Sequence, residues 1–127
     1  MDQMTRVTEA LYLKEFAKVQ PILEEEGRIR TALRHLDEQR QQGHDELSAD
    51  STMQRMGADI LWQTWAARTR TSLNIELAQV LARKETVLDQ VRKAFGKREA
   101  LKKIVLQEKK QRDLRRTTKQ QQSIVNP

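Results

Sequence analysis

Apolar residues recur at alternating intervals of four and three after Leu73, and this repeat restricts the fold more than any other feature. The positions reached are Leu77, Val80, Lys84, Val87, Val91, Ala94, Arg98, Leu101 and Val105, of which seven are apolar. A mean spacing of about 3.5 residues aligns side chains along one side of a helix, as in the seam of a coiled coil. We therefore expect a long helix over about residues 52–116.

The composition also favours helices over sheets. Only four Gly and two Pro occur in 127 residues, whereas hairpins, sandwiches and barrels need turn residues at short intervals. The hydrophobic fraction of 37% and the charged fraction of 33% make the chain too polar for an ordinary compact domain. The remainder is rich in good helix formers, so we expect an all-α fold.

An earlier helix is predicted over about residues 4–42. Its apolar residues recur at helical spacing, at Met4, Val7, Leu11, Ile22, Ile29, Leu33 and Leu36. Pro21 interrupts this stripe. Either a kink near Gln20 or a new helix start there fits the sequence, because proline is tolerated in the first turn of a helix.

Turn-forming residues gather only at 43–52, which we interpret as a loop between the two helices. Gly43 is a candidate stop for the first helix. Ser51 and Gln54 have the spacing of a capping box, which predicts the start of the second.

Several positions of the second helix depart from a simple seam. Leu81, Leu88, Phe95 and Ile104 widen the apolar stripe on one flank, and Gly96 is either absorbed by the helix or bends it. Lys84 and Arg98 occupy seam positions, where charged residues usually lower stability in exchange for a defined register. On this basis Lys84→Leu is expected to raise the melting temperature and self-association. Residues 117–127 lose the periodicity and are predicted to be a flexible tail.

The two helices are predicted to fold back on each other as an antiparallel coiled-coil hairpin, a single elongated domain. At about 1.5 Å per residue, a helix of about 65 residues is roughly 97 Å long, and one of about 37 residues is roughly 55 Å long. The N-terminus then reaches only the neighbourhood of residue 90. The longer second helix is expected to overhang at its C-terminal end.

Charge is concentrated in this predicted overhang. Residues 97–119 contain ten Lys or Arg against Glu99, Glu108 and Asp113, whereas residues 1–96 contain fourteen basic and fifteen acidic residues. A segment that is cationic, amphipathic and unpartnered is a candidate binding surface. The candidate partner-binding residues are Phe95, Leu101, Lys102, Lys103, Ile104, Val105, Lys109 and Lys110.

Three interpretations of this basic segment are open. It could be a solvated face that keeps the protein soluble, a nucleic-acid-binding helix, or a protein-binding surface. A basic helix that continues from a coiled coil is typical of zipper-type DNA binders. However, Leu101, Ile104 and Val105 run through the segment, and no cluster of base-reading residues accompanies them. A protein partner that accepts both charge and apolar side chains fits better.

Both tryptophans of the chain, Trp62 and Trp65, lie three residues apart near the predicted loop. One interpretation is that they pack on Leu33 or Leu36 and fasten the loop end of the hairpin. The alternative is a recognition patch, since tryptophan is enriched at the centres of interfaces. Both residues are therefore included among the candidate partner-binding residues.

No catalytic, cofactor-binding or metal-binding pattern is found in the sequence. It has no cysteine and no glycine-rich phosphate loop. His35 and His44 are interpreted as a helix-face and a loop residue, and the run Glu24–Glu26 as favourable charge near a helix start. The absence of a long apolar segment or an apolar leader predicts a soluble, cytoplasmic protein. We also expect that it is not an enzyme, because a two-helix rod offers no concave site.

The pattern resembles the FliJ proteins of the bacterial flagellar export apparatus and their YscO counterparts in type III secretion. The resemblance rests on a small basic chain without cysteine, two unequal helices, and charged repeats such as ARKETVLDQVRKAFGKREALKKIVLQEKKQRDLRR. It implies an antiparallel coiled coil shaped like the central stalk of rotary ATPases. It also implies association with the hexameric export ATPase, the export gate and export chaperones, at the periphery of a membrane-embedded apparatus.

Three functional hypotheses follow. The first is a non-enzymatic stalk or adaptor of a flagellar or type III export apparatus. The second is a basic coiled-coil nucleic-acid-binding protein, which would use the same segment. The third is a plain coiled-coil scaffold, and the apolar seam also permits self-association.

Overall fold

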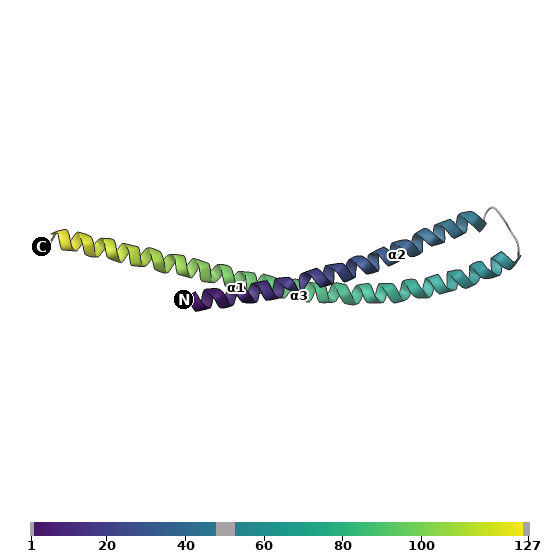
Figure 1. Cartoon of the computed structure of the whole chain (residues 1–127), viewed down its shortest axis with the longest axis horizontal. Helices are drawn as coiled ribbons and strands as arrows, with labels where there is room; N and C mark the ends of the chain where they lie inside the picture. The colour runs from purple at the N-terminus through teal and green to yellow at the C-terminus, as the bar shows by residue number, and fades with distance from the viewer. Residues whose placement is uncertain (1, 48–52, 126–127) are drawn as a thin grey trace. The chain divides into compact units, whose positions relative to one another are not determined.

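The computed structural model describes residues 2–47 and 53–125, with side chains for 2–43 and 56–125. The described chain forms three α-helices, α1 (Asp2–Ala17), α2 (Val19–Leu47) and α3 (Met53–Val125). Only Lys18 separates α1 from α2, and we refer to the two helices as the N-terminal arm. Each of them packs antiparallel on one part of α3 (Figure 1). The predicted fold class, an all-α antiparallel hairpin of unequal helices, is confirmed.

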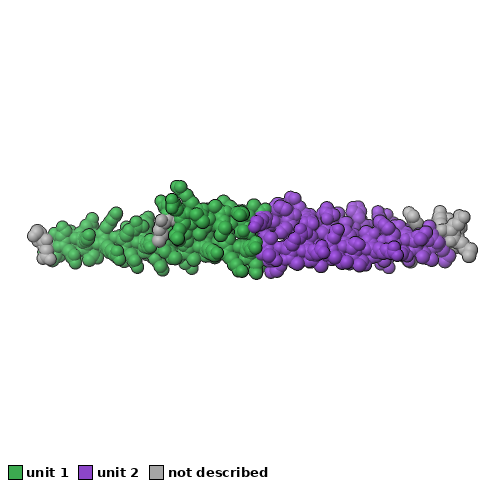
Figure 2. All heavy atoms as spheres, turned by 90° about the horizontal axis from the view of Figure 1, so that it is seen from below, with its two compact units in different colours: residues 1–17, 88–127 green, residues 18–87 purple. Residues whose placement is uncertain are grey.

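The hairpin divides into two units, each of which pairs one N-terminal helix with one part of α3 (Figure 2). Unit 1 contains α1 and the part of α3 from Leu88 onward. Unit 2 spans residues 18–87 and contains α2 and the first part of α3. The two units are described separately below.

The interruption at Lys18 has a direct cause in Pro21. Proline has no backbone N–H, so Pro21 cannot donate to the carbonyl of Ala17, four residues earlier, and its ring crowds that carbonyl. The α-helix ends at Ala17 and resumes at Val19, which places Pro21 in the first turn of α2. Proline is tolerated in a first turn because those N–H groups lack intrahelical partners. Of the two alternatives that the sequence left open near Gln20, the structure has the new helix start, at Val19.

Replacing Pro21 by Ala is expected to join α1 and α2 into one helix. The new N–H of residue 21 can donate to the Ala17 carbonyl, and the loss of proline removes a penalty of up to about 3 kcal/mol for a helix interior. Hydrogen exchange of the amides around Lys18 should slow in this variant. Glu24→Ala, in the same helix, is the control. Unchanged exchange around Lys18 would show that Pro21 does not cause the break.

Two predicted helix ends are wrong. Gly43 does not stop the first helix, since α2 continues to Leu47 and no glycine in the described residues has a positive φ. The predicted tail is helical as far as Val125. The hydroxyls of Thr117 and Thr118 donate to the carbonyls of Asp113 and Leu114, each at 2.9 Å, which accommodates both threonines within the helix. Residues 48–52 of the predicted loop, and with them Ser51 of the capping box, lie outside the described residues.

The predicted seam of α3 is confirmed along its whole length. Val80 and Ala94 are buried, and the other seam positions from Leu73 to Val105 are half-buried. The helix passes through Gly96 without interruption, so the cost of this glycine is absorbed.

The predicted flank is partly wrong. Leu81, Leu88 and Phe95 are spaced by seven, but Ile104 is nine residues beyond Phe95 and so lies on the opposite flank.

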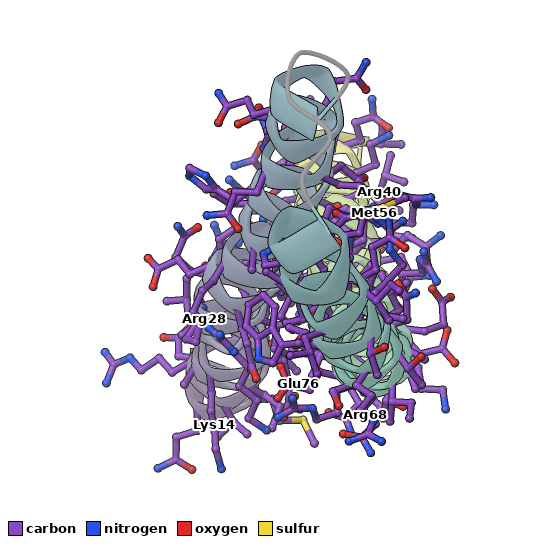
Figure 3. All side chains as sticks on the ribbon, turned by 90° about the vertical axis from the view of Figure 1, so that its right-hand side faces the viewer. Lys14, Arg28, Arg40, Met56, Arg68 and Glu76 are labelled. Atoms are coloured by element: carbon purple, nitrogen blue, oxygen red, sulfur yellow. The ribbon has the colours of Figure 1, made fainter. Side chains whose placement is uncertain are left out.

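In unit 2, α2 and α3 pair through a mixed apolar and charged seam. Ile29, Leu36, Ala66 and Val80 are its buried apolar residues. Ion pairs cross between the helices along both edges. They join Arg28 to Glu76 (3.8 Å; Figure 3), Arg83 to Glu25 (3.2 Å) and Arg70 to Asp37.

Lys84, the charged residue at a seam position of unit 2, pairs with a carboxylate from α2. Its Nζ donates to both oxygens of Glu26, at 3.0 and 3.4 Å. The Glu26 side chain is only 14% exposed. At this seam position, therefore, a mostly buried carboxylate relies on the Lys84 ammonium as its partner across the two helices.

In unit 1, α1 uses a different face from the one predicted. Met4, Val7 and Leu11 are exposed, whereas the half-buried residues are Thr5, Thr8, Glu9, Tyr12 and Glu15. The seam of α2 shows which face of α1 is used. Ile29, Leu33 and Leu36 are spaced by four and then three residues. Counting back in the same alternation from Ile22 reaches Val19, Glu15, Tyr12, Thr8 and Thr5. The stripe of Met4, Val7 and Leu11 follows a second phase that the structure does not use.

Candidate partner-binding surface

Two contacts between α1 and α3 fix the register of unit 1. Arg98 pairs with Glu9 at 3.4 Å, and the rings of Phe95 and Tyr12 have centroids 5.9 Å apart. In both pairs the two residue numbers add to 107, so this register places Asp2 opposite Val105. The N-terminal arm therefore covers α3 to about Val105, not to residue 90 as predicted.

The predicted overhang was too long partly because the first helix was made too short. The arm begins at Asp2 rather than Met4 and ends at Leu47 rather than residue 42. Leu101 and Val105, predicted to be an unpartnered apolar edge, are half-buried in unit 1. Every described residue from Leu106 to Val125 is exposed. We call Leu106–Val125 the C-terminal extension, and Figure 1 shows it running past the N-terminus of α1.

The other predicted binding residues fall into two groups. Lys109 and Lys110 lie on the C-terminal extension, fully within the uncovered part of α3. Phe95, Lys102, Lys103 and Ile104 are exposed residues of the covered part. Within that part, Lys102 pairs with Glu99 at 3.7 Å. The structure therefore separates residues that the sequence placed in one segment.

The C-terminal extension continues the seam of α3 with charged residues in place of apolar ones. Steps of three and four after Val105 reach Glu108, Arg112, Arg115, Lys119 and Gln122. Lys109 and Arg116 follow two of these positions and broaden the face. We call Lys109, Arg112, Arg115, Arg116 and Lys119 the basic stripe. The extension carries six Lys or Arg against Glu108 and Asp113, which gives it a charge of +4.

The apolar residues of the C-terminal extension are dispersed around the helix. Leu106, Leu114, Ile124 and Val125 are exposed and do not share the seam face. The extension therefore has no apolar stripe with which a second copy could form a coiled coil. Its organised feature is the basic stripe.

Arg98 is the centre of a polar and aromatic cluster in unit 1. Its guanidinium carbon lies 4.2 Å from the centroid of the Tyr12 ring and 5.2 Å from that of Phe95. Its terminal nitrogens lie 3.4 Å from carboxylate oxygens of Glu9 and Glu99. The Arg98 Nε is buried and has no hydrogen-bond partner within the described residues. The side chain thus links α1 to α3 mainly through its planar guanidinium face and its charge.

The two tryptophans have different surroundings in unit 2. Trp62 is half-buried and lines a groove with Leu36, Arg40 and Ala66. This matches the predicted packing of a tryptophan near Leu36. Trp65 does not share that groove, and its side chain is 54% exposed. Trp65 is therefore the more exposed of the two tryptophans.

The described residues contain no group of three or more His, Cys, Asp or Glu side chains placed to hold a metal ion. A membrane-crossing helix was also sought in the described part of the chain, and none is both long and apolar enough.

Sequence reasoning missed the face of α1 and the basic stripe. Glu9 and Tyr12 were not predicted to contact α3, although counting back from Ile22 would have placed Tyr12 on the seam. Arg112, Arg115 and Lys119 were included in the net charge of residues 97–119, but it was not recognised that they continue the spacing of the seam. In both cases the signal was the continuation of the heptad phase into a segment with few apolar residues.

The chain matches no family model, no curated protein and no solved structure.

Proposed function

We propose that this protein is a non-catalytic stalk or adaptor of a bacterial flagellar or type III secretion export apparatus. Its C-terminal extension binds the hexameric export ATPase in this proposal, and the export gate and export chaperones are further protein partners. The protein acts in the cytoplasm, beside the membrane-embedded apparatus, and needs no cofactor.

The observation that carries the proposal is the C-terminal extension itself. All of its residues, Leu106–Val125, are exposed and none packs on another described helix, and its charge is +4. Holding such a segment as a continuation of a paired helix lowers the entropy cost of binding, because the segment is already ordered. Its basic stripe suits a partner surface lined with carboxylates, which would accelerate association and select orientation.

The proposal is tested by reversing charge on opposite sides of the same helix. The double variant Arg112→Glu, Arg116→Glu removes two cations of the basic stripe. The matched control Lys103→Glu, Lys110→Glu changes the charge equally on the opposite side of α3. Association with a purified hexameric export ATPase is expected to slow about tenfold or more in the stripe variant and much less in the control.

Three results would contradict the proposal. Equal slowing in both variants would mean that the net charge of the protein, not the basic stripe, determines its association rate with the ATPase. An absence of binding by the unaltered protein would remove the export ATPase as partner. Duplex DNA bound more tightly than the ATPase, with an affinity that falls steeply with salt, would favour the nucleic-acid hypothesis. Circular dichroism of each variant is the folding control.

A further inference from the structure

Three exposed apolar side chains of α1 lie together on one flank of its seam with α3. Met4, Val7 and Leu11 are 62%, 64% and 39% exposed. Met4 and Leu11 immediately precede the seam residues Thr5 and Tyr12, and Val7 is between them on the same side of the helix. Thus α1 presents polar residues to α3 and keeps an apolar stripe free.

The aromatic contacts show which flank of α3 lies beside this stripe. Phe16 and Phe95 each follow a seam position, and both rings lie about 6 Å from the Tyr12 ring, at 6.0 and 5.9 Å between centroids. Residues that follow seam positions therefore share one flank of unit 1. Residues that precede seam positions must share the opposite flank, because neighbouring helices contact along a single line.

On α3 the flank that precedes the seam carries Ile104. This residue comes directly before Val105 and is 46% exposed. The register of unit 1 places Met4 opposite Lys103, adjacent to Ile104. We call Met4, Val7, Leu11 and Ile104 the aliphatic flank of unit 1.

Three lysines lie on the same side of the helices as the aliphatic flank. Lys14 lies on the same side of α1 as Val7, and Lys93 and Lys97 lie on the same side of α3 as Ile104. The carboxylates of α1 and of residues 88–105 occupy other positions. Glu9 and Glu99 pair with Arg98, Glu15 is on the seam, and Asp2 and Asp89 are on the following flank and the outer face.

From this arrangement we propose that the aliphatic flank binds an amphipathic helix of another protein, whose apolar stripe is bordered by carboxylates. The partner helix lies along α1 and α3 as a third helix, with its carboxylates beside Lys14, Lys93 and Lys97. A second copy of this chain would instead bring lysines against lysines, which opposes association. The site is distinct from the C-terminal extension, so it is independent of the proposed export function.

The probe is a synthetic helical peptide built from heptads, with Leu at the first and fourth positions and Glu at the fifth and seventh. A second peptide carries Lys in place of Glu. With the full-length protein, fluorescence anisotropy is expected to show at least about tenfold tighter binding of the Glu peptide. The Lys93→Glu, Lys97→Glu variant should remove that preference.

The apolar part of the site is tested with Val7→Ser, Leu11→Ser. This variant should bind the Glu peptide about tenfold or more weakly, because two aliphatic side chains are no longer buried by the complex. Leu13→Ser removes an exposed leucine outside the flank and should bind normally. All substituted residues are exposed, and circular dichroism checks that each variant retains its helices.

Several outcomes would overturn the proposal. Equal affinity for the Glu and Lys peptides would exclude an acidic partner, and normal binding by Val7→Ser, Leu11→Ser would place the peptide elsewhere. Tighter flank-dependent binding to phosphatidylglycerol vesicles than to the Glu peptide would make the flank a membrane surface. Self-association in sedimentation that Val7→Ser, Leu11→Ser abolishes would make a second copy the occupant.

Discussion

Replacing Lys84 by Leu is expected to destabilise the protein, by about 1–3 kcal/mol, in contrast to the prediction from sequence. The sequence showed a lysine at a seam position, where leucine would normally pack better. The structure adds Glu26, whose mostly buried carboxylate receives the Lys84 ammonium at 3.0 Å. Without Lys84 this carboxylate keeps its desolvation cost and loses its main partner. Arg30, at 3.8 Å on the same helix, replaces only part of that interaction.

A double-mutant cycle tests this explanation. Glu26→Leu alone should also destabilise, whereas Lys84→Leu with Glu26→Leu should recover stability to the original level or above, since an apolar pair often replaces a buried ion pair without loss. Urea denaturation followed by circular dichroism gives the four free energies of unfolding. Sedimentation should show more self-association in the double variant, because the ion pair no longer defines the register. Stabilisation by Lys84→Leu alone would mean that Glu26 reaches water freely.

Replacing Arg98 by Ala is expected to release α1 from α3 while α2 stays paired. No described residue of α1 is fully buried, and an isolated helix of its length is marginal in water. Arg98 supplies the cation that lies over Tyr12 and pairs with Glu9, and each cation–π contact contributes about 0.5–2 kcal/mol. Its removal also takes away the guanidinium that lies over both the Tyr12 and the Phe95 ring. The contacts of Arg98 therefore contribute a large part of the free energy that keeps α1 packed on α3.

Hydrogen exchange resolved by residue tests the Arg98 prediction. In Arg98→Ala the amides of α1 should exchange at least about tenfold faster, while those around Ile29 and Val80 should not change. Lys103→Ala, an exposed residue of the same helix, is the control. Arg98→Lys should fall between the two, because lysine keeps the charge but not the planar guanidinium. Unchanged protection of α1 in Arg98→Ala would mean that the other contacts suffice.

The sequence predicted the seam of α3 correctly because the repeat is long and nearly unbroken. From Leu73 to Val105 only Lys84 and Arg98 interrupt it, and both interruptions were identified. Their partners were not. Glu26 is 58 residues from Lys84 and Glu9 is 89 residues from Arg98. Such pairings depend on the register of the hairpin, which depends in turn on the turn that joins its helices.

The face of α1 could not be read from hydrophobicity alone. Two phases compete there, and Met4, Val7 and Leu11 form the more apolar one. The structure instead turns Thr8 and Tyr12 toward α3, because these two residues continue the four-and-three spacing of the seam in the adjacent helix α2.

The position of the predicted overhang was wrong for a different reason. The first helix was predicted to start two residues too late and to end five residues too early, and both errors lengthened the part of α3 expected to be uncovered.

The antiparallel pairing of α1 with the C-terminal half of α3 has a consequence for synthesis on the ribosome. Pairs near the turn, such as Asp37 with Arg70, are separated by 33 residues, whereas Glu9 and Arg98 are separated by 89. Translation at about 5–20 residues per second therefore leaves α1 without its partner for roughly 5–20 s after Glu9 is made. The hairpin is expected to close from its turn toward its ends, since short loops cost less entropy than long ones. During that interval the face of α1 that later packs on α3, which includes Thr8 and Tyr12, is open to chaperones and to other nascent chains.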